Sequence, residues 1–270
     1  IGMVRQYSAT PGAAFTPAGD PIMFDHDGDG VKMNTGWIAP DDGMLVLDRN
    51  GNGTIDSGQE LFGDSTYRIG ESRDGFTALA QEDTNSDGVV NNLDANWANL
   101  KVWRDLNQDA ISQTNELFSL PELGITSINV TKSGYSERLA DGNSIHGTST
   151  FTKSDGTTGN IADIFFEVDT FTSKFSNEIT VAADVKDLPN MNGAGLVREL
   201  HQAATLSTVL KDLLTQYKQA TTRQEQLGII DALLDAWADT SGLAESIEMR
   251  INKEYSHIYN DLDAAEFQKL

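Results

Sequence analysis

The last third of the chain is patterned for helices. From about residue 190, apolar residues recur at intervals of three and four, which puts them on one face of an amphipathic helix. Three such stripes follow one another, from Leu196 to Tyr217, from Leu227 to Trp237 and from Leu243 to Leu262. A capping box of Thr222 and Glu225 starts the second stripe, which stops near Gly242. We expect the three stripes to form the core of a C-terminal helical bundle.

The segment from about residue 125 to about residue 170 is patterned for strands. "ITSINVTKS" alternates apolar and polar residues, and "STFTKSDGTTGNIADIFFEV" reads as a strand, a glycine-containing turn and a second strand. Further upstream, Leu93, Trp97, Leu100 and Trp103 step by four, three and three, which predicts a short helix between two flanking loops.

Composition narrows the range of partners. The 270 residues carry a formal net charge of −22, with a pI of about 4.3. Phosphate groups would repel such a chain, so we expect no binding to nucleic acid or to anionic membranes. There is no cysteine for a disulfide or a thiolate metal site, and no run of about 18 apolar residues that would predict a membrane span. Because Ile1 does not begin a signal peptide, we expect the chain to start inside a longer protein.

The acidic residues are grouped in loops of fixed spacing. In "DTNSDGVVNNLD", Asp83, Asn85 and Asp87 stand at positions 1, 3 and 5, a glycine at 6 and Asp94 at 12. This is the spacing of a calcium loop, in which alternate side chains point inward and the carbonyl at position 7, here that of Val89, joins them. Aspartate at position 12 is shorter than the usual glutamate, so this loop must close more tightly or bind through one oxygen.

Three further loops repeat the spacing. "DLNQDAISQTNE" has Ala110 at position 6, where a left-handed φ costs alanine about 1 kcal/mol. "DRNGNGTIDSGQE" is one residue longer and must bend at Gly58 to deliver its closing acid. "DHDGDGVKMNTG" has no acid at position 12, and the nearest candidates to close it are Asp41 and Asp42. The ligands that these three loops predict are Asp105, Asn107, Asp109, Ile111 and Glu116; Asp48, Asn50, Asn52, Thr54 and Glu60; and Asp25, Asp27, Asp29 and Val31, with Asp41 or Asp42.

Four such loops in one acidic chain predict calcium as the cofactor. Ca²⁺ takes about six to eight oxygen ligands, whereas Mg²⁺ prefers few protein ligands and keeps its waters. Together with the strand and helix patterns, the loops predict an α+β fold: EF-hand-like calcium loops with short helices, a small antiparallel β region, and a C-terminal helical bundle. We expect two domains, a calcium-binding module at residues 1–175 and a helical segment at residues 176–270.

No motif of a turnover enzyme accompanies the loops. The chain contains no H-E-x-x-H, no G-x-S-x-G and no P-loop sequence. Its four histidines are scattered. His26 stands at position 2 of its loop, where side chains point outward, so we expect it to be solvated.

Three stretches of the sequence resemble a known family. "FDHDGDGVKMNTGWIAPDDGMLVLDRNGNGTIDSGQELFGD", "LKVWRDLNQDAISQTNELFSLPELGI" and "TFTKSDGTTG" look like the self-processing region of the FrpC-type iron-regulated RTX proteins. The resemblance covers about residues 20–175, and the helical zone resembles the segment that follows. It implies an extracellular protein, secreted by a type I pathway, whose module is folded by calcium. It also implies autocatalytic cleavage of an Asp–Pro bond, after which the freed aspartyl group can join a lysine amine of another protein.

The chain contains one Asp–Pro bond, Asp20–Pro21. In one register of the resemblance it is the bond that is cleaved, because Asp-Pro precedes an acidic loop as in the family. In the other register the residues after Asp25 match a later loop, and the cleaved bond lies upstream of Ile1. The second register matches more residues, so we favour an Asp20–Pro21 bond that stays intact.

Two functions without catalysis remain as alternatives. The chain can be a structural or interaction module of a secreted toxin or adhesin, which meets its partner through the helical surface. It can instead be a dockerin-like binding unit, which the 22-residue interval between Asp83 and Asp105 favours. A dockerin stands alone, however, whereas these loops run into strands and helices.

Overall fold

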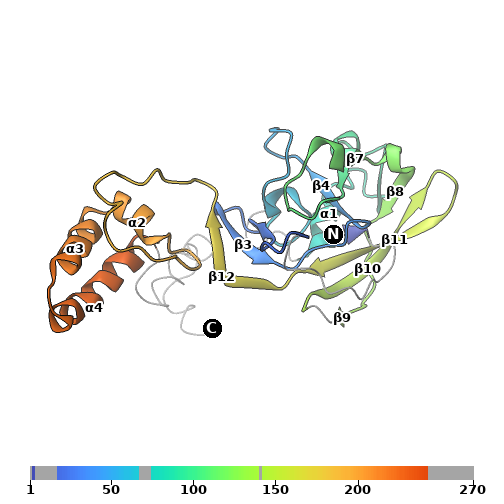
Figure 1. Cartoon of the computed structure of the whole chain (residues 1–270). Coiled ribbons are helices and arrows are strands. Elements are labelled where there is room, and N and C mark those ends of the chain that lie inside the picture. Colours follow the sequence, from blue (N-terminus) through green and yellow to red (C-terminus); the bar gives the residue numbers. More distant parts are fainter. Residues whose placement is uncertain (1, 4–16, 67–73, 140–141, 243–270) are drawn as a thin grey trace, which may run out of the picture. The chain divides into compact units, whose positions relative to one another are not determined.

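Antiparallel strands build the first of the two units into which the chain divides, Ile1–Ser176 and Asn177–Leu270. The computed structural model describes residues 2–3, 17–66, 74–139 and 142–242 (Figure 1). Among the described residues, the first unit holds the strands and the short helix α1 (Gly75–Ala80), and the second holds the three longer helices.

The strands of the first unit form two sheets. The larger has nine strands in the order β5-β8-β10-β11-β1-β4-β6-β7, with β9 paired to β10, and the smaller has the order β12-β3-β2. The strands are β1 (Gly2–Met3), β2 (Met23–Phe24), β3 (Val31–Thr35), β4 (Gly43–Leu47), β5 (Val89–Asn91), β6 (Leu100–Trp103), β7 (Leu117–Ser119), β8 (Ile125–Asn129), β9 (Glu137–Arg138), β10 (Ser144–Lys153), β11 (Thr158–Phe165) and β12 (Val168–Phe175). Four 3-10 turns join them: η1 (Gly58–Glu60), η2 (Trp97–Asn99), η3 (Thr114–Glu116) and η4 (Pro121–Leu123).

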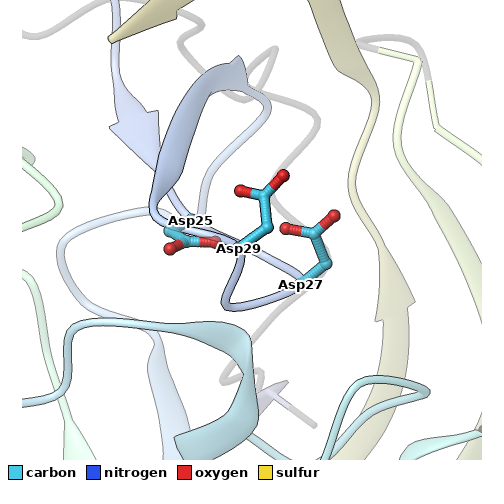
Figure 2. A group of neighbouring side chains, drawn as sticks. All are labelled: Asp25, Asp27 and Asp29. Atoms are coloured by element: carbon cyan, nitrogen blue, oxygen red, sulfur yellow. The ribbon is translucent and has the colours of Figure 1, made fainter. Parts of the chain in front are cut away.

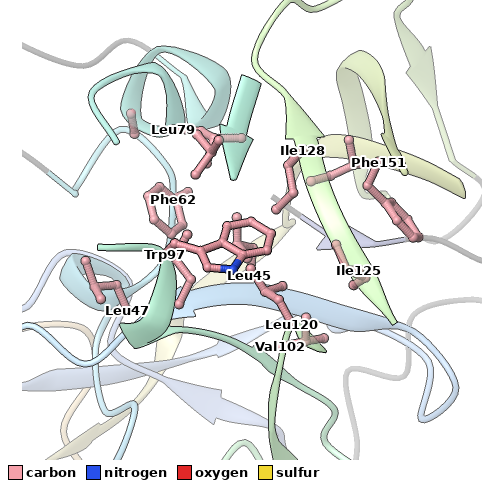
Figure 3. Packing of buried hydrophobic residues seen from close by; sticks show 14 of the residues in the cluster. Leu45, Leu47, Phe62, Leu79, Trp97, Val102, Leu120, Ile125, Ile128 and Phe151 are labelled. Atoms are coloured by element: carbon pink, nitrogen blue, oxygen red, sulfur yellow. The ribbon is translucent and has the colours of Figure 1, made fainter. Parts of the chain in front are cut away.

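Two hydrophobic clusters stabilise this unit. Figure 3 shows the larger one, in which Leu45 of β4, Trp97 and Ile128 of β8 meet among other buried side chains. The second cluster is aromatic and contains Phe24 and Trp103. Alternate residues of β6 serve different clusters, because Val102 belongs to the first and Trp103 to the second. Each fully buried side chain of this size stabilises the fold by about 1.5–3 kcal/mol.

The expected α+β class is wrong. The described chain is mostly β-sheet with a few short helices, and none of its acidic loops lies between two α-helices as in an EF-hand; only α1, which ends shortly before Asp83, adjoins one of them. The expected helix over residues 93–103 is instead the 3-10 turn η2 followed by strand β6, which pairs with β4 and β7. The spacing of these four apolar residues fits a helix, but pairing with the two neighbouring strands decided the outcome. Leu93, the first residue of the presumed stripe, is 71% exposed.

The strand pattern in the second half of this unit is confirmed. Ile125–Asn129 forms β8, and "STFTKSDGTTGNIADIFFEV" lies on the hairpin of β10 and β11. Its turn carries Gly156 at φ 82°, a conformation that glycine adopts without steric cost.

The second unit contains α2 (Leu200–Leu206), α3 (Thr208–Gln219) and α4 (Arg223–Asp239). The first predicted stripe is broken at Ser207, whose side chain accepts the Leu210 N–H and so starts a new helix. The capping box of Thr222 and Glu225 is confirmed at the start of α4. The buried face of that helix is formed by Leu233, Ala236 and Trp237, whereas Leu227 and Leu234 of the predicted stripe are exposed.

The third predicted stripe, Leu243 to Leu262, lies outside the described residues. Among the helices that are described, none combines the length and the apolar character needed to cross a bilayer.

Candidate metal centre

The four acidic loops share one backbone conformation. Positions 4 and 6 of every loop have positive φ, whichever residue occupies them. The φ angles are 75° and 87° at Gly28 and Gly30, 73° and 85° at Gly51 and Gly53, 59° and 91° at Ser86 and Gly88, and 57° and 55° at Gln108 and Ala110. In the described chain, every non-glycine residue with positive φ lies in these loops. Since left-handed backbone costs such residues about 1–2 kcal/mol each, the rest of the Asp83 loop and of the Asp105 loop must hold this shape.

The first acid of each loop provides part of that restraint. Its carboxylate turns inward and accepts backbone N–H groups from positions 4 to 6. Asp25 accepts those of Gly28 and Gly30 at 2.7 and 2.9 Å. Asp83 accepts that of Gly88 at 2.8 Å, and the carboxylate of Asp105 accepts that of Ala110 at the same distance.

The side chain at position 5 is held in the same way in all four loops. It accepts the N–H of position 7, at 2.7–3.1 Å, in the pairs Asp29–Val31, Asn52–Thr54, Asp87–Val89 and Asp109–Ile111. In three loops the amide oxygen at position 3 accepts the N–H of position 5, in the pairs Asn50–Asn52, Asn85–Asp87 and Asn107–Asp109. The oxygen-bearing side chains at positions 1, 3 and 5 are therefore folded onto one short stretch of backbone.

The closing acids return to their own loops. Asp94, Glu116 and Glu60 are all buried, and each accepts the N–H of position 9, which belongs to Asn91, Gln113 and Asp56 respectively. The short side chain of Asp94 also accepts the Thr84 N–H at 2.8 Å. Burial raises the pKa of Asp94, but hydrogen bonds from Asn91 and Thr84 outweigh burial and hold this pKa below its ordinary value.

Glu60 has an oxygen that the protein does not satisfy. Its side chain is 2% exposed, Oε2 accepts the Asp56 N–H at 2.9 Å, and Oε1 has no hydrogen-bond partner. Burial raises the pKa of Glu60, and the nearby carboxylates of Asp56 and Asp48 raise it further, while the backbone N–H groups of Asp56 and Asn50 lower it without reversing the shift. An orphaned buried carboxylate oxygen next to further carboxylates is the arrangement that a bound cation would satisfy.

The Asp25 loop carries the tightest group of acids. One oxygen from each of Asp25, Asp27 and Asp29 lies within 4.8 Å of the others, and this group could hold a metal ion. Figure 2 shows the three side chains on one short loop, with those of Asp27 and Asp29 projecting side by side. Burial raises the pKa of Asp25 and of Asp29, as does the charge of Asp27.

This loop rests on the next one rather than on an acid at its own position 12. The Gly58 N–H donates to the Asp25 carbonyl at 2.8 Å, and a Cβ at Gly58 would overlap the backbone of His26. Asp41 and Asp42 lie in a turn, where the Asp42 N–H donates to Ala39, and the described structure does not bring either into the group around Asp25.

His26 is partly buried, so the expectation of a solvated ring is wrong. The ring packs 5.2 Å from Phe24 and 5.7 Å from Phe166, and Nε2 lies 2.8 Å from the Thr35 hydroxyl. Burial lowers the pKa of His26 to about 4, so the ring is neutral near pH 7. The apolar side chains of the adjoining strands drew this residue inward, which its loop position alone did not indicate.

The Asp105 loop is tied to the aromatic cluster. The Trp37 indole N–H donates to Asp105 Oδ2 at 2.7 Å, and that of Trp103 donates to Glu116 Oε2 at 3.5 Å. The two indoles are themselves in edge contact, with ring centroids 5.5 Å apart. The geometry of this loop therefore depends on the packing of the two tryptophans, and the positions of the tryptophans depend in turn on the loop.

Position 9 is a feature that the sequence reasoning missed. Asp56 accepts the side-chain amide of Asn52 at 2.7 Å, and the Gln113 side chain reaches Asp109 at 3.0 Å, while its own Oε1 is buried without a partner. Both residues therefore face their loops. The calcium-loop numbering itself marks position 9 as a ligand position, often through water, and would have pointed to them.

Asp20 and Pro21, the residues of the Asp–Pro bond, are both exposed, and the residue that follows them, Ile22, is fully buried.

The donors present suit a hard cation. Carboxylate and amide oxygens face each loop, and such oxygens are the ligands that calcium prefers over the nitrogen and sulfur ligands of zinc. The residues at positions 1, 3 and 5 would hold the ion, with the carbonyl of position 7 and, in three loops, the closing acid Glu60, Asp94 or Glu116.

Comparison with known proteins gives two results. Residues 10–167 match the family model of the SPM domain. A curated relative, the iron-regulated protein FrpA of Neisseria meningitidis serogroup C, is 40% identical over an alignment of 242 residues, and the match covers 88% of this chain. The chain spans 22% of the length of that relative.

Proposed function

Because this chain belongs to the SPM domain family, we propose that its first unit, close to residues 1–175, is a calcium-binding module that folds around its ions. In this proposal the helical segment, close to residues 176–270, links the calcium-binding module to the rest of the host protein or presents the module to a partner. Similarity to an iron-regulated protein supports a host protein of the FrpA and FrpC type, and from the sequence resemblance we infer that this host is secreted and of the RTX class.

One observation carries the calcium proposal. All four loops repeat the same left-handed positions, including strained ones at Ser86, Gln108 and Ala110, and fold their side-chain oxygens onto one stretch of backbone. A plain acidic turn has no reason to keep this backbone in every copy, nor its strain at the non-glycine positions of the Asp83 and Asp105 loops. A bound cation compensates it, because it replaces repulsion between the inward carboxylates by coordination.

The net charge of −22 makes the ions part of the fold. Without cations the loops hold several carboxylates in close proximity, which favours expansion. Each site filled at about 100 times its Kd adds about 2.7 kcal/mol to the free energy of unfolding. Since extracellular modules bind calcium with Kd of about 10⁻⁴–10⁻³ M, such a module would stay loose in a cytosol and fold after export.

Calcium titration of the purified chain tests this proposal. Terbium, which takes oxygen ligands as calcium does, is a suitable probe because Trp37 and Trp103 contact the Asp105 loop and can sensitise its emission. We expect tryptophan-excited terbium emission that calcium displaces and that Asp105→Asn reduces. Emission that is absent, or unaffected by calcium, would contradict the proposal.

The module could also cleave its own chain at the Asp20–Pro21 bond, and this self-processing is the catalytic variant of the proposal. The Asp20 carboxylate would attack its own peptide carbonyl, form a cyclic anhydride and expel the Pro21 nitrogen, which takes up a proton. Water would open the anhydride to a new C-terminus, or a lysine amine of another protein would open it to an isopeptide bond. The exposed position of Asp20–Pro21 supports access to the bond, and orientation by a folded loop could supply several kcal/mol.

We favour the form in which Asp20–Pro21 stays intact and the module is a calcium-folded scaffold. Mass spectrometry of the chain after prolonged incubation in calcium separates the two forms. An intact chain is the expected result. Fragments that end at Asp20 and start at Pro21, and that disappear in Asp20→Asn and in chelator, would establish cleavage instead.

A further inference from the structure

A cavity of about 200 Å³ opens in the first unit, apart from the inward faces of the acidic loops. Most of its wall is apolar and includes Leu61, Phe62 and Phe166. Its acidic side chains are Asp64 and Asp163. None of the described residues that line it is a lysine or an arginine. Lys132 acts on Asp163 through its charge, but its ammonium group is paired with Asp74.

Asp163 is the unusual group in this wall. It belongs to β11 and is 2% exposed. Oδ1 accepts the Gly75 N–H at 3.3 Å, whereas Oδ2 has no hydrogen-bond partner. A buried carboxylate oxygen without a partner is costly, and proteins keep one where a ligand, water or ion completes it.

We propose that this cavity binds a primary alkylammonium group, anchored on Asp163 Oδ2. The ammonium head would donate to the unsatisfied oxygen, and the alkyl stem would lie against the apolar wall. Phe62 and Phe166 add apolar side-chain surface to this wall. The cavity is smaller than the pockets of about 300–1,000 Å³ that hold drug-sized ligands, so a single alkyl chain suits it.

A metal ion fits this cavity less well. Among the described residues, the acidic groups that converge closely enough to share an ion are Asp25, Asp27 and Asp29, and Asp163 does not join them. Two carboxylates in a mostly apolar wall provide too few oxygens for a calcium site, whereas a single carboxylate oxygen is enough to bind an ammonium group. The inference does not depend on calcium binding by the loops.

The ammonium could come from a free amine or from a lysine side chain, and the test separates the two. The probes are n-butylammonium, Nα-acetyl-lysinamide and, as the uncharged control, 1-butanol. Amide ¹H–¹⁵N chemical shifts of the full chain in saturating calcium are followed during titration. We expect saturable shifts at Gly75, Ile164 and Phe165 with the amines and not with butanol. Shifts with butylammonium alone identify a free amine as the ligand, whereas equal shifts with the lysinamide identify a lysine side chain.

Asp163→Asn provides the matched variant, because asparagine keeps the acceptor for Gly75 and removes the charge. It should weaken amine binding about tenfold or more, the loss expected for a charge-assisted hydrogen bond. Asp231→Asn, on the exposed side of α4, should leave binding unchanged. Without amine, Asp163→Asn should melt at the same temperature as the parent chain or higher, since it removes an unsatisfied buried carboxylate.

Two outcomes would overturn the inference. One is a cavity that responds equally to butanol and to butylammonium, or to neither. The other is Asp163→Asn that lowers the melting temperature without amine while leaving amine binding intact, because Oδ2 would then be satisfied within the protein.

Discussion

Replacement of Glu60 by glutamine tests whether the buried carboxylate oxygen Oε1, which has no hydrogen-bond partner, serves as a metal ligand. Glutamine keeps the size of the side chain and the acceptor for the Asp56 N–H, but removes the charge. In the metal-free protein Oε1 is buried without a partner, next to the carboxylates of Asp48 and Asp56. Loss of that charge should therefore leave metal-free stability unchanged or raise it.

In calcium the sign should reverse, because the closing ligand is lost. A site filled at about 100 times its Kd contributes about 2.7 kcal/mol, and a site weakened about 100-fold contributes about 0.4 kcal/mol at the same calcium concentration. The free energy of unfolding should thus fall by about 2.3 kcal/mol, which is a large part of the 5–15 kcal/mol that is typical of whole domains.

Urea denaturation at a series of calcium concentrations measures both effects. Each bound ion adds about 0.6 kcal/mol to the free energy of unfolding for every e-fold rise in calcium, so Glu60→Gln should show a shallower dependence than the parent chain. Glu122→Gln, an exposed acid in η4 that accepts the Ser119 N–H, is the control and should shift stability equally at all calcium concentrations. A constant offset for Glu60→Gln, with an unchanged slope, would refute the role given to this residue.

Three further predictions concern other parts of the molecule. Burial raises the pKa of Glu60 above its ordinary value of 4.5, so the folded metal-free chain holds a proton that the unfolded chain has lost, whereas His26, whose pKa burial lowers to about 4, acts in the opposite direction in the parent and in Glu60→Gln alike; in chelator, melts should therefore show the stability of the parent relative to Glu60→Gln falling as pH rises from about 4.5 toward neutrality. Trp37→Phe should reduce tryptophan-sensitised terbium emission, whereas Trp237→Phe, in the second unit, should not. Thr222→Ala should lower the stability of α4 by about 1 kcal/mol in a denaturant melt, through loss of the capping box, without changing calcium affinity in a titration.

The loops could be read from the sequence because their geometry is local. Spacing alone placed inward-facing oxygens at positions 1, 3 and 5, and the structure folds them as one pattern in all four copies. The left-handed backbone expected at Ala110 is present, with φ of 55°. Glu60 could be predicted as the closing acid of the Asp48 loop although that loop is one residue longer, because the Glu60 carboxylate still accepts the N–H of Asp56 at position 9.

Features that depend on distant partners were not readable in this way. The apolar residues from Leu93 to Trp103 fit a helical period, but β4 and β7 made Leu100–Trp103 a strand. The cavity around Asp163 joins residues from both ends of the first unit, and no local spacing links them. In the second unit the missed feature is local: Ser207 caps a new helix start and so divides one predicted helix into two, which the apolar stripe did not indicate.

Calcium binding that folds the first unit is the central claim, and far-ultraviolet circular dichroism of the purified chain during calcium titration tests it most directly. Starting from chelator, we expect β-sheet signal to develop cooperatively with calcium, with a midpoint of about 10⁻⁴–10⁻³ M, and to disappear when chelator is restored. A spectrum and a melting temperature that stay the same from chelator to saturating calcium would contradict the claim.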